Sequence, residues 1–99
     1  MRDIRLAKLD KVRPVVVLTR AAVLPYLHQV TVAPVTSTIR GLSTEVPVGR
    51  ANGLDYDSVV SCDNILTIPT AALGRHLGVL LGWQEAVLAA AIRTAFDLV

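Results

Sequence analysis

Cysteine is almost absent from this chain of 99 residues, which contains only Cys62. A lone cysteine excludes an internal disulfide and is typical of a reducing compartment. Because Cys62 lies in an apolar, strand-like pattern, we interpret it as a core residue rather than a nucleophile. The apolar runs are too short for a signal peptide or a membrane-spanning helix, since Gln84, Glu85 and Arg93 interrupt the one near the C-terminus. We therefore expect a cytoplasmic protein without a membrane segment.

Sequence signatures of metal and cofactor sites are lacking too. The chain has no glycine-rich phosphate loop and no pair of Cys or His residues at the spacing of metal ligands. We therefore expect neither a metal ion nor a cofactor. His28 and His76 have no acidic residue close to them in sequence. We interpret each as a surface or packing histidine, with a general base as the open alternative.

Aromatic residues make up only 4% of the chain, whereas 53% of it is hydrophobic. The length predicts one domain, residues 1–99, which would bury roughly 60 to 65% of its unfolded surface. A core of that size is too small for so many apolar side chains. We therefore expect a homodimer or an obligate partner, and we interpret Trp83 and Phe96 as anchors of the core or of the dimer.

Positive charge is modest overall, at a net charge of +2, but it is concentrated at the start of the chain. Residues 1–20 hold six of the ten Lys and Arg residues and two of the eight acidic residues, a local balance of +4. A basic stretch of this kind suits an anionic ligand, but an ordinary solvated face has the same composition. Charge alone leaves both interpretations open.

Short β-rich segments alternate with turn signals along most of the chain. Hydrophobic patterning predicts strands over residues 3–9, 15–18, 29–36, 44–49, 58–62, 65–68 and 75–81. The connection over residues 10–12 is so short that the first two strands must form an antiparallel hairpin. Pro47 marks an edge strand, and residues 83–98 form a helix whose apolar stripe extends to Leu98. The order predicts an α+β domain, mainly β and barrel-like.

Two short motifs could carry chemistry. Arg13 precedes Pro14, and the proline disfavours helical backbone at Arg13, so the guanidinium is held at the start of an apolar strand. Held in this way, it would either grip a phosphate or carboxylate or remain a solvated residue flanking the strand. The second motif is PVTST at residues 34–38. Its hydroxyls would form either a turn that satisfies the backbone or part of an anion site.

These motifs resemble those of the MazF/PemK family of bacterial toxins. The similar segments follow the family's order over nearly the whole chain: RPVVVLT (13–19), VAPVTS (32–37), EVPVG (45–49), NGLDYDSVV (52–60) and CDNILTI (62–68). The resemblance implies an SH3-like β-barrel of the PemK/MazF/CcdB type with a C-terminal helix, acting as a homodimer. It implies metal-independent, sequence-specific cleavage of single-stranded RNA through attack of the ribose 2′-OH. A small MazE-like antitoxin would neutralise the toxin.

The resemblance also assigns roles to individual residues. The catalytic pair of the family corresponds to Arg13 and Thr36, and we expect further RNA contacts from Lys11, Arg20, Ser37, Thr38, Arg40 and Asn64. The loop over residues 10–12 is shorter than is usual in the family, which predicts an altered RNA groove. Two other functions remain open: a gyrase poison on the same fold, which cleaves nothing, and an SH3-like binding module.

Overall fold

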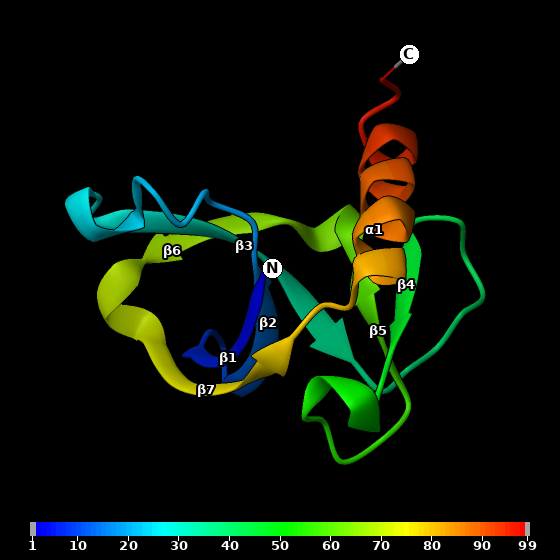
Figure 1. Cartoon of the computed structure of the whole chain (residues 1–99), viewed down its shortest axis with the longest axis horizontal. Helices are drawn as coiled ribbons and strands as arrows, with labels where there is room; N and C mark the ends of the chain where they lie inside the picture. The colour runs from blue at the N-terminus through cyan, green and yellow to red at the C-terminus, as the bar shows by residue number, and fades with distance from the viewer. Residues whose placement is uncertain (1, 99) are drawn as a thin grey trace.

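The computed structural model describes residues 2–98 as a curled antiparallel sheet with a helix packed at one end (Figure 1). The strands are β1 (Asp3–Lys8), β2 (Val12–Val17), β3 (Gln29–Thr36), β4 (Glu45–Val48), β5 (Ser58–Ser61), β6 (Leu66–Pro69) and β7 (Leu73–Val79). The helix is α1 (Gly82–Ala95), and four 3-10 turns connect the strands: η1 (Leu24–Tyr26), η2 (Arg50–Asn52), η3 (Cys62–Asn64) and η4 (Thr70–Ala72). The predicted mainly β, barrel-like architecture is confirmed, in the form of a half-barrel.

Strand β3 lies at the centre of the sheet. The strand order is β4-β5-β3-β2-β1-β7, and β6 pairs with β3 outside this path. The first half of β3 pairs with β6, its middle with β2, and its last two residues with β5. The predicted hairpin of β1 and β2 is present, with Lys8 opposite Val12. β4 is an edge strand, as Pro47 indicated, whereas β7 begins at Leu73, two residues before the predicted start.

The core consists of two apolar clusters on the two faces of the sheet. In β2, Val16 belongs to one cluster while Val15 and Val17 belong to the other, so the strand is buried on both faces, as predicted. In β3, Val32 and Ala33 divide in the same way. This two-sided burial explains why both strands read as continuous β-branched runs rather than alternating ones. Cys62 is a buried core residue, and burial raises the pKa of its thiol to about 11.

Helix α1 stands beside β4 and β5 in Figure 1 and packs on β4 and η3. Leu88 and Ala91 are buried in this contact, in agreement with the predicted stripe. None of the helices formed by residues 2–98 is long and apolar enough to span a membrane.

The C-terminal end of α1 differs from the prediction. Asp97 adopts left-handed backbone with φ 54°, and the Leu98 N–H donates to the Arg93 carbonyl at 2.8 Å. This is the hydrogen-bond pattern that ends a helix, so the stripe does not reach Leu98. Phe96 and Trp83 are 55% and 58% exposed. Their predicted role as core anchors is therefore wrong, and a role in a dimer stays a prediction.

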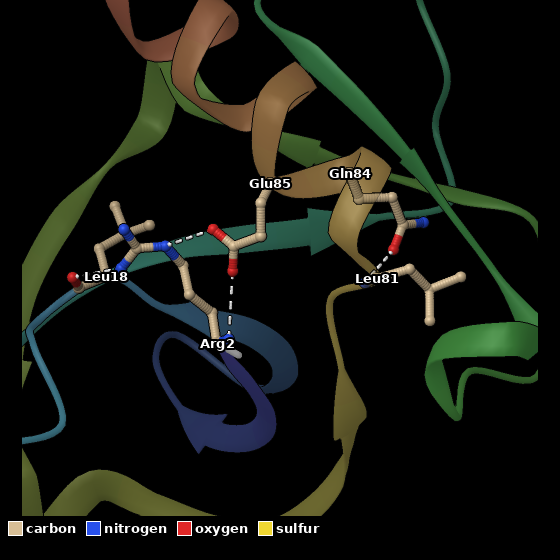
Figure 2. A network of polar contacts seen from close by, with 5 residues as sticks. All are labelled: Arg2, Leu18, Leu81, Gln84 and Glu85. Carbon is tan, nitrogen blue, oxygen red and sulfur yellow. Dashed lines mark hydrogen bonds and ion pairs between the residues drawn. The ribbon is translucent and has the colours of Figure 1, made fainter.

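Polar contacts fasten the start of α1 to the sheet. Glu85 accepts hydrogen bonds from the backbone N–H and from Nε of Arg2, both at 3.2 Å, and Arg2 Nη1 donates to the Leu18 carbonyl at 2.9 Å (Figure 2). The neighbouring Gln84 accepts from the Leu81 N–H at 2.8 Å. These bonds hold the first turn of the helix against the N-terminal strand.

The side chains of Asn52 and Gln84 form a buried amide pair behind this contact. Asn52 Nδ2 donates to Gln84 Oε1 at 2.6 Å, and Gln84 Nε2 donates to Asn52 Oδ1 at 3.0 Å. The remaining amide protons go to the carbonyls of Val79 and Pro47. The pair is therefore fully satisfied and joins η2, β7, β4 and α1.

We predict that Asn52→Ala lowers the free energy of unfolding by about 2–3 kcal/mol, because it leaves the buried Gln84 amide and the Gly49 N–H without their partner. Urea denaturation measures the change. The matched control is Asn64→Ala, which removes the same amide from an exposed position and should stay within about 0.5 kcal/mol of the parent. Equal effects of the two substitutions would contradict a structural role for the amide pair.

Candidate active site

A cleft of about 750 Å³ opens between the β1–β2 hairpin and the end of β3. The hairpin and β2 contribute Leu9, Asp10 and Arg13 to one side, and β3 contributes Pro34 and Thr36. The other side consists of Thr38, Arg40, Leu42, Glu45, Ser61, Asp63, Asn64 and Leu66. Polar groups of both charge signs thus converge in one concave site, which is the usual form of a ligand-binding site.

Arg13 forms a two-point ion pair with Asp10. Its Nε lies 3.1 Å from Asp10 Oδ1, and its Nη2 lies 3.3 Å from Oδ2. The short turn makes this contact possible, because the Leu9 N–H donates to the Lys11 carbonyl at 3.0 Å and folds Asp10 back over β2. The hydrogen bond from Arg13 is the main reason why the pKa of Asp10 falls to about 2, and the same bond raises the pKa of Arg13.

Thr36 is the last residue of β3, and its hydroxyl is already oriented. The backbone N–H of Thr38 donates to Thr36 Oγ1 at 3.1 Å, which is the hydroxyl turn that the sequence allowed. Because the oxygen accepts this bond, the hydroxyl proton is available to a ligand in the cleft. Thr36 therefore offers a hydrogen-bond donor on the floor of the same cleft as Arg13.

The structure brings together five of the eight site residues expected from the sequence: Arg13, Thr36, Thr38, Arg40 and Asn64 all line the cleft. Lys11 and Ser37 are exposed and adjoin lining residues in sequence, but they are not among them. Arg20 lies apart, in a small hollow of about 80 Å³ with Arg2 and Thr19. The roles of all eight residues toward RNA remain predictions.

Three acidic residues of the cleft were not identified from the sequence. Asp10 pairs with Arg13, as described above. Glu45 accepts hydrogen bonds from the N–H groups of Arg40, at 3.2 and 3.3 Å, and Leu42, at 3.0 Å. Asp63 Oδ2 accepts from the Thr44 hydroxyl at 2.6 Å. The only sequence signal for Glu45 and Asp63 was their place in the family motifs EVPVG and CDNILTI.

The two histidines do not belong to the cleft. His28 is exposed at the start of β3. His76 faces Asp3, with 3.4 Å between Nε2 and Oδ1, and lines a second hollow of about 420 Å³. Within residues 2–98, no three His, Cys, Asp or Glu side chains are grouped closely enough to hold a metal ion.

Comparison with known proteins places the chain in a family. Residues 2–96 match the sequence model of the family described as PemK-like, MazF-like toxins of type II toxin-antitoxin systems. The chain belongs to this family. The resemblance of its motifs is thereby confirmed, and the half-barrel with its C-terminal helix is the MazF fold.

Individual relatives of this MazF-like toxin agree with the family match. Endoribonuclease MazF3 of Mycobacterium tuberculosis H37Rv is 61% identical over 98 residues, which are 99% of this chain and 95% of the relative. The structure of Mycobacterium tuberculosis toxin MazF-mt6 is 60% identical and covers 99% of both chains with a TM-score of 0.97. A mycobacterial endoribonuclease in complex with its cognate antitoxin shares the fold, with a TM-score of 0.87 at 24% identity, covering 98% of this chain and 93% of that one.

We predict that the ion pair of this MazF-like toxin holds Asp10 ionised to low pH. The folded-state pKa of about 2 lies below the ordinary value of 3.8, so the stabilisation from Asp10 is complete above about pH 4 and is lost as the pH falls through 2. NMR titration of the Asp10 carboxyl carbon measures the pKa. Arg13→Ala should raise it toward 3.8, and the control Arg40→Ala should leave it unchanged. A pKa near 2 in Arg13→Ala would show that the pair is not its cause.

Proposed function

We propose that the cleft is where this endoribonuclease toxin cuts single-stranded RNA at specific sequences, without a metal ion, by attack of a ribose 2′-OH on the adjacent phosphate. The endoribonuclease activity follows from family membership and from 61% identity to Endoribonuclease MazF3. The observation that carries the proposed site is the convergence of Arg13, on β2, and Thr36, at the end of β3, in one cleft, although 22 positions separate them in the sequence.

The proposed reaction forms a bond between the 2′ oxygen and phosphorus and breaks the bond from phosphorus to the 5′ oxygen. The products are a cyclic phosphate and a 5′-OH. The 2′-OH must lose a proton, the phosphoryl oxygens must be stabilised as charge develops, and the leaving oxygen must gain a proton. No atom from outside the RNA is needed for this step.

Arg13 suits the stabilisation of charge on the phosphoryl oxygens. Its guanidinium is always charged and presents a planar fork of donors, and the pair with Asp10 raises its pKa further. It cannot therefore serve as a base near neutral pH. The Thr36 hydroxyl, oriented by the Thr38 N–H, donates its proton toward the same oxygens.

Asp10 acts in this proposal as a positioning residue. A carboxyl group with a pKa of about 2 is a weak proton acceptor at neutral pH, but its two-point contact fixes the plane of the Arg13 guanidinium. The rate enhancement then comes mainly from position and electrostatics rather than from strong general acid-base catalysis.

As a type II toxin, the protein is neutralised by an antitoxin. We further propose that residues 1–99 act as one toxin domain in the cytoplasm and that the antitoxin is a small MazE-like protein. Large apolar side chains on the surface support a homodimer, among them Val12 at 61%, Tyr26 at 83% and Trp83 at 58% exposure. Analytical ultracentrifugation of the toxin alone tests the dimer.

Arg13→Ala should slow RNA cleavage on the order of 10²-fold or more, because it removes the charge that stabilises the phosphoryl oxygens. The assay incubates the protein with a long single-stranded RNA in EDTA and maps the new 5′ ends. Arg75→Ala is the matched control, since Arg75 is an exposed arginine of the second hollow and lies outside the cleft.

Cleavage at an unchanged rate by Arg13→Ala would refute the proposed site. Loss of all cleavage in EDTA, restored by a divalent metal, would refute the metal-independent reaction. RNA left intact by the parent protein, together with inhibition of gyrase, would instead identify a poison on the same fold.

A further inference from the structure

We infer that Asp63 makes the cleft select a base that carries an exocyclic amino group and disfavour uracil at the same position. The inference rests on the proposed function, because it concerns the RNA held in the cleft beside Arg13. It names the chemical feature by which that RNA would be recognised.

The cleft places donors from Arg13 and Thr36 on one side and acceptors from Asp63 and Asn64 on the opposite side, which also carries Arg40. In the sheet, β2 and β5 flank β3, so Arg13 on β2 and Asp63, in the turn that follows β5, lie on opposite sides of β3. Arg13 and Thr36 supply N–H and O–H groups suited to a phosphate. Because η3 lines the same cleft, a nucleoside attached to a phosphate held there can extend toward Asp63 and Asn64.

The η3 side of the cleft presents open acceptors. Asp63 Oδ2 is engaged by the Thr44 hydroxyl at 2.6 Å, and no group in residues 2–98 donates to Oδ1. Asn64 uses its Nδ2 to donate to Ser61 Oγ at 2.8 Å, which leaves its carbonyl oxygen open. Asp63 and Asn64 both line the cleft, so two acceptor oxygens on neighbouring residues are left without a hydrogen bond in this part of it.

Asp63 is held in place more firmly than an ordinary surface aspartate. The residue before it, Cys62, is buried, and its N–H donates to the Thr44 carbonyl at 3.0 Å. Thr44 thus holds η3 at two points: its carbonyl accepts from the Cys62 N–H, and its hydroxyl donates to the Asp63 carboxylate. A carboxylate held in this way discriminates between ligands because it does not have to be ordered on binding.

The other acid on this side, Glu45, cannot take the same role. Both of its carboxylate oxygens accept backbone N–H groups from Arg40 or Leu42, so it holds the wall of the cleft together. Asp63 is thus the acidic side chain of this wall with an oxygen free for a base.

A fixed carboxylate oxygen accepts the amino protons of cytosine, adenine or guanine. Uracil offers one N–H between two carbonyl oxygens, and a carboxylate repels those oxygens. Single-stranded RNA exposes these base edges, because its bases are unstacked. When uracil occupies the position, the carboxylate oxygen lacks a donor, and the cost of this unpaired acceptor gives about 10-fold or more discrimination between the bases.

The test uses short RNAs built around one mapped cleavage site. Each adenosine in turn is replaced by the purine ribonucleoside and each guanosine by inosine, so that one amino group is removed, and each cytidine is replaced by uridine, which carries an oxygen in place of the amino group. We expect kcat/KM for the parent protein to fall about 10-fold or more at one position. Asp63→Asn should abolish or reverse this preference, because its carbonyl can keep the Thr44 bond while its NH₂ replaces the free oxygen.

Asp55→Asn is the matched control, since it removes an equal charge from an exposed residue outside the cleft and should keep the parent preference. Thermal unfolding checks that Asp63→Asn is folded. If that variant proves too slow to assay, the same RNA pairs are compared by binding to Arg13→Ala with and without Asp63→Asn, and the same change of preference is expected.

A parent protein that is indifferent to every amino group, or an Asp63→Asn variant with the parent preference, would overturn the inference and leave the proposed nuclease intact. A parent protein that cleaves no RNA would instead overturn the proposed function itself.

Discussion

The structure depends on the pairing of a single strand, β3, with three others. Its eight residues pair with β6 at one end, with β2 in the middle and with β5 at the other end. β6 and β5 follow one another along one edge of β3 while β2 takes the other edge, and the sheet curls around this strand (Figure 1). That curl brings η3, which follows β5, toward the start of β2. The cleft is therefore a product of strand pairing, and Thr36 lies within it because β3 ends there.

The wall of the cleft is connected to the start of α1 through β4. As an edge strand, β4 has hydrogen bonds to β5 alone within the sheet, so its position also depends on the helix packed against it. Gln84, in the first turn of α1, donates to the Pro47 carbonyl at 3.0 Å. Glu45, two residues earlier in β4, then fixes the backbone at Arg40 and Leu42. Contacts therefore connect the buried amide pair, through β4, to the loop at the cleft.

The strands that carry the proposed catalytic pair could be predicted from the sequence because their burial leaves a pattern. Both faces of β2 and β3 are covered, and both therefore consist of β-branched and small apolar residues. The end of α1 leaves no such pattern, since it is set by the left-handed backbone at Asp97 while the apolar residues continue. Exposure of Trp83 and Phe96 was missed for a related reason, because hydrophobicity does not tell whether a neighbour covers the side chain.

The site residues, too, divide into those whose position leaves a pattern in the sequence and those whose position does not. Arg13 and Thr36 could be predicted to lie in one site because each lies at or near the end of a strand within a family motif. Arg20 was expected to contact RNA, but β2 runs between it and Arg13 and separates the two by roughly 3.3 Å for each extended residue. The role of Asp10 was not predicted, because its ion pair with Arg13 depends on the turn from Leu9 to Lys11. The amino-acid composition of a segment does not indicate such a turn.

The ion pair with Asp10 leaves Arg13 with enough free N–H groups to bind a phosphate as well. A guanidinium carries five N–H donors, and Asp10 takes one on Nε and one on Nη2, so three of the five remain. These three lie at the end of the fork and on its far edge, away from the carboxylate. Arg13 can therefore keep Asp10 as its support while it grips a phosphate. Supporting carboxylate and substrate phosphate then occupy different edges of one planar group, a division that a lysine ammonium could not provide.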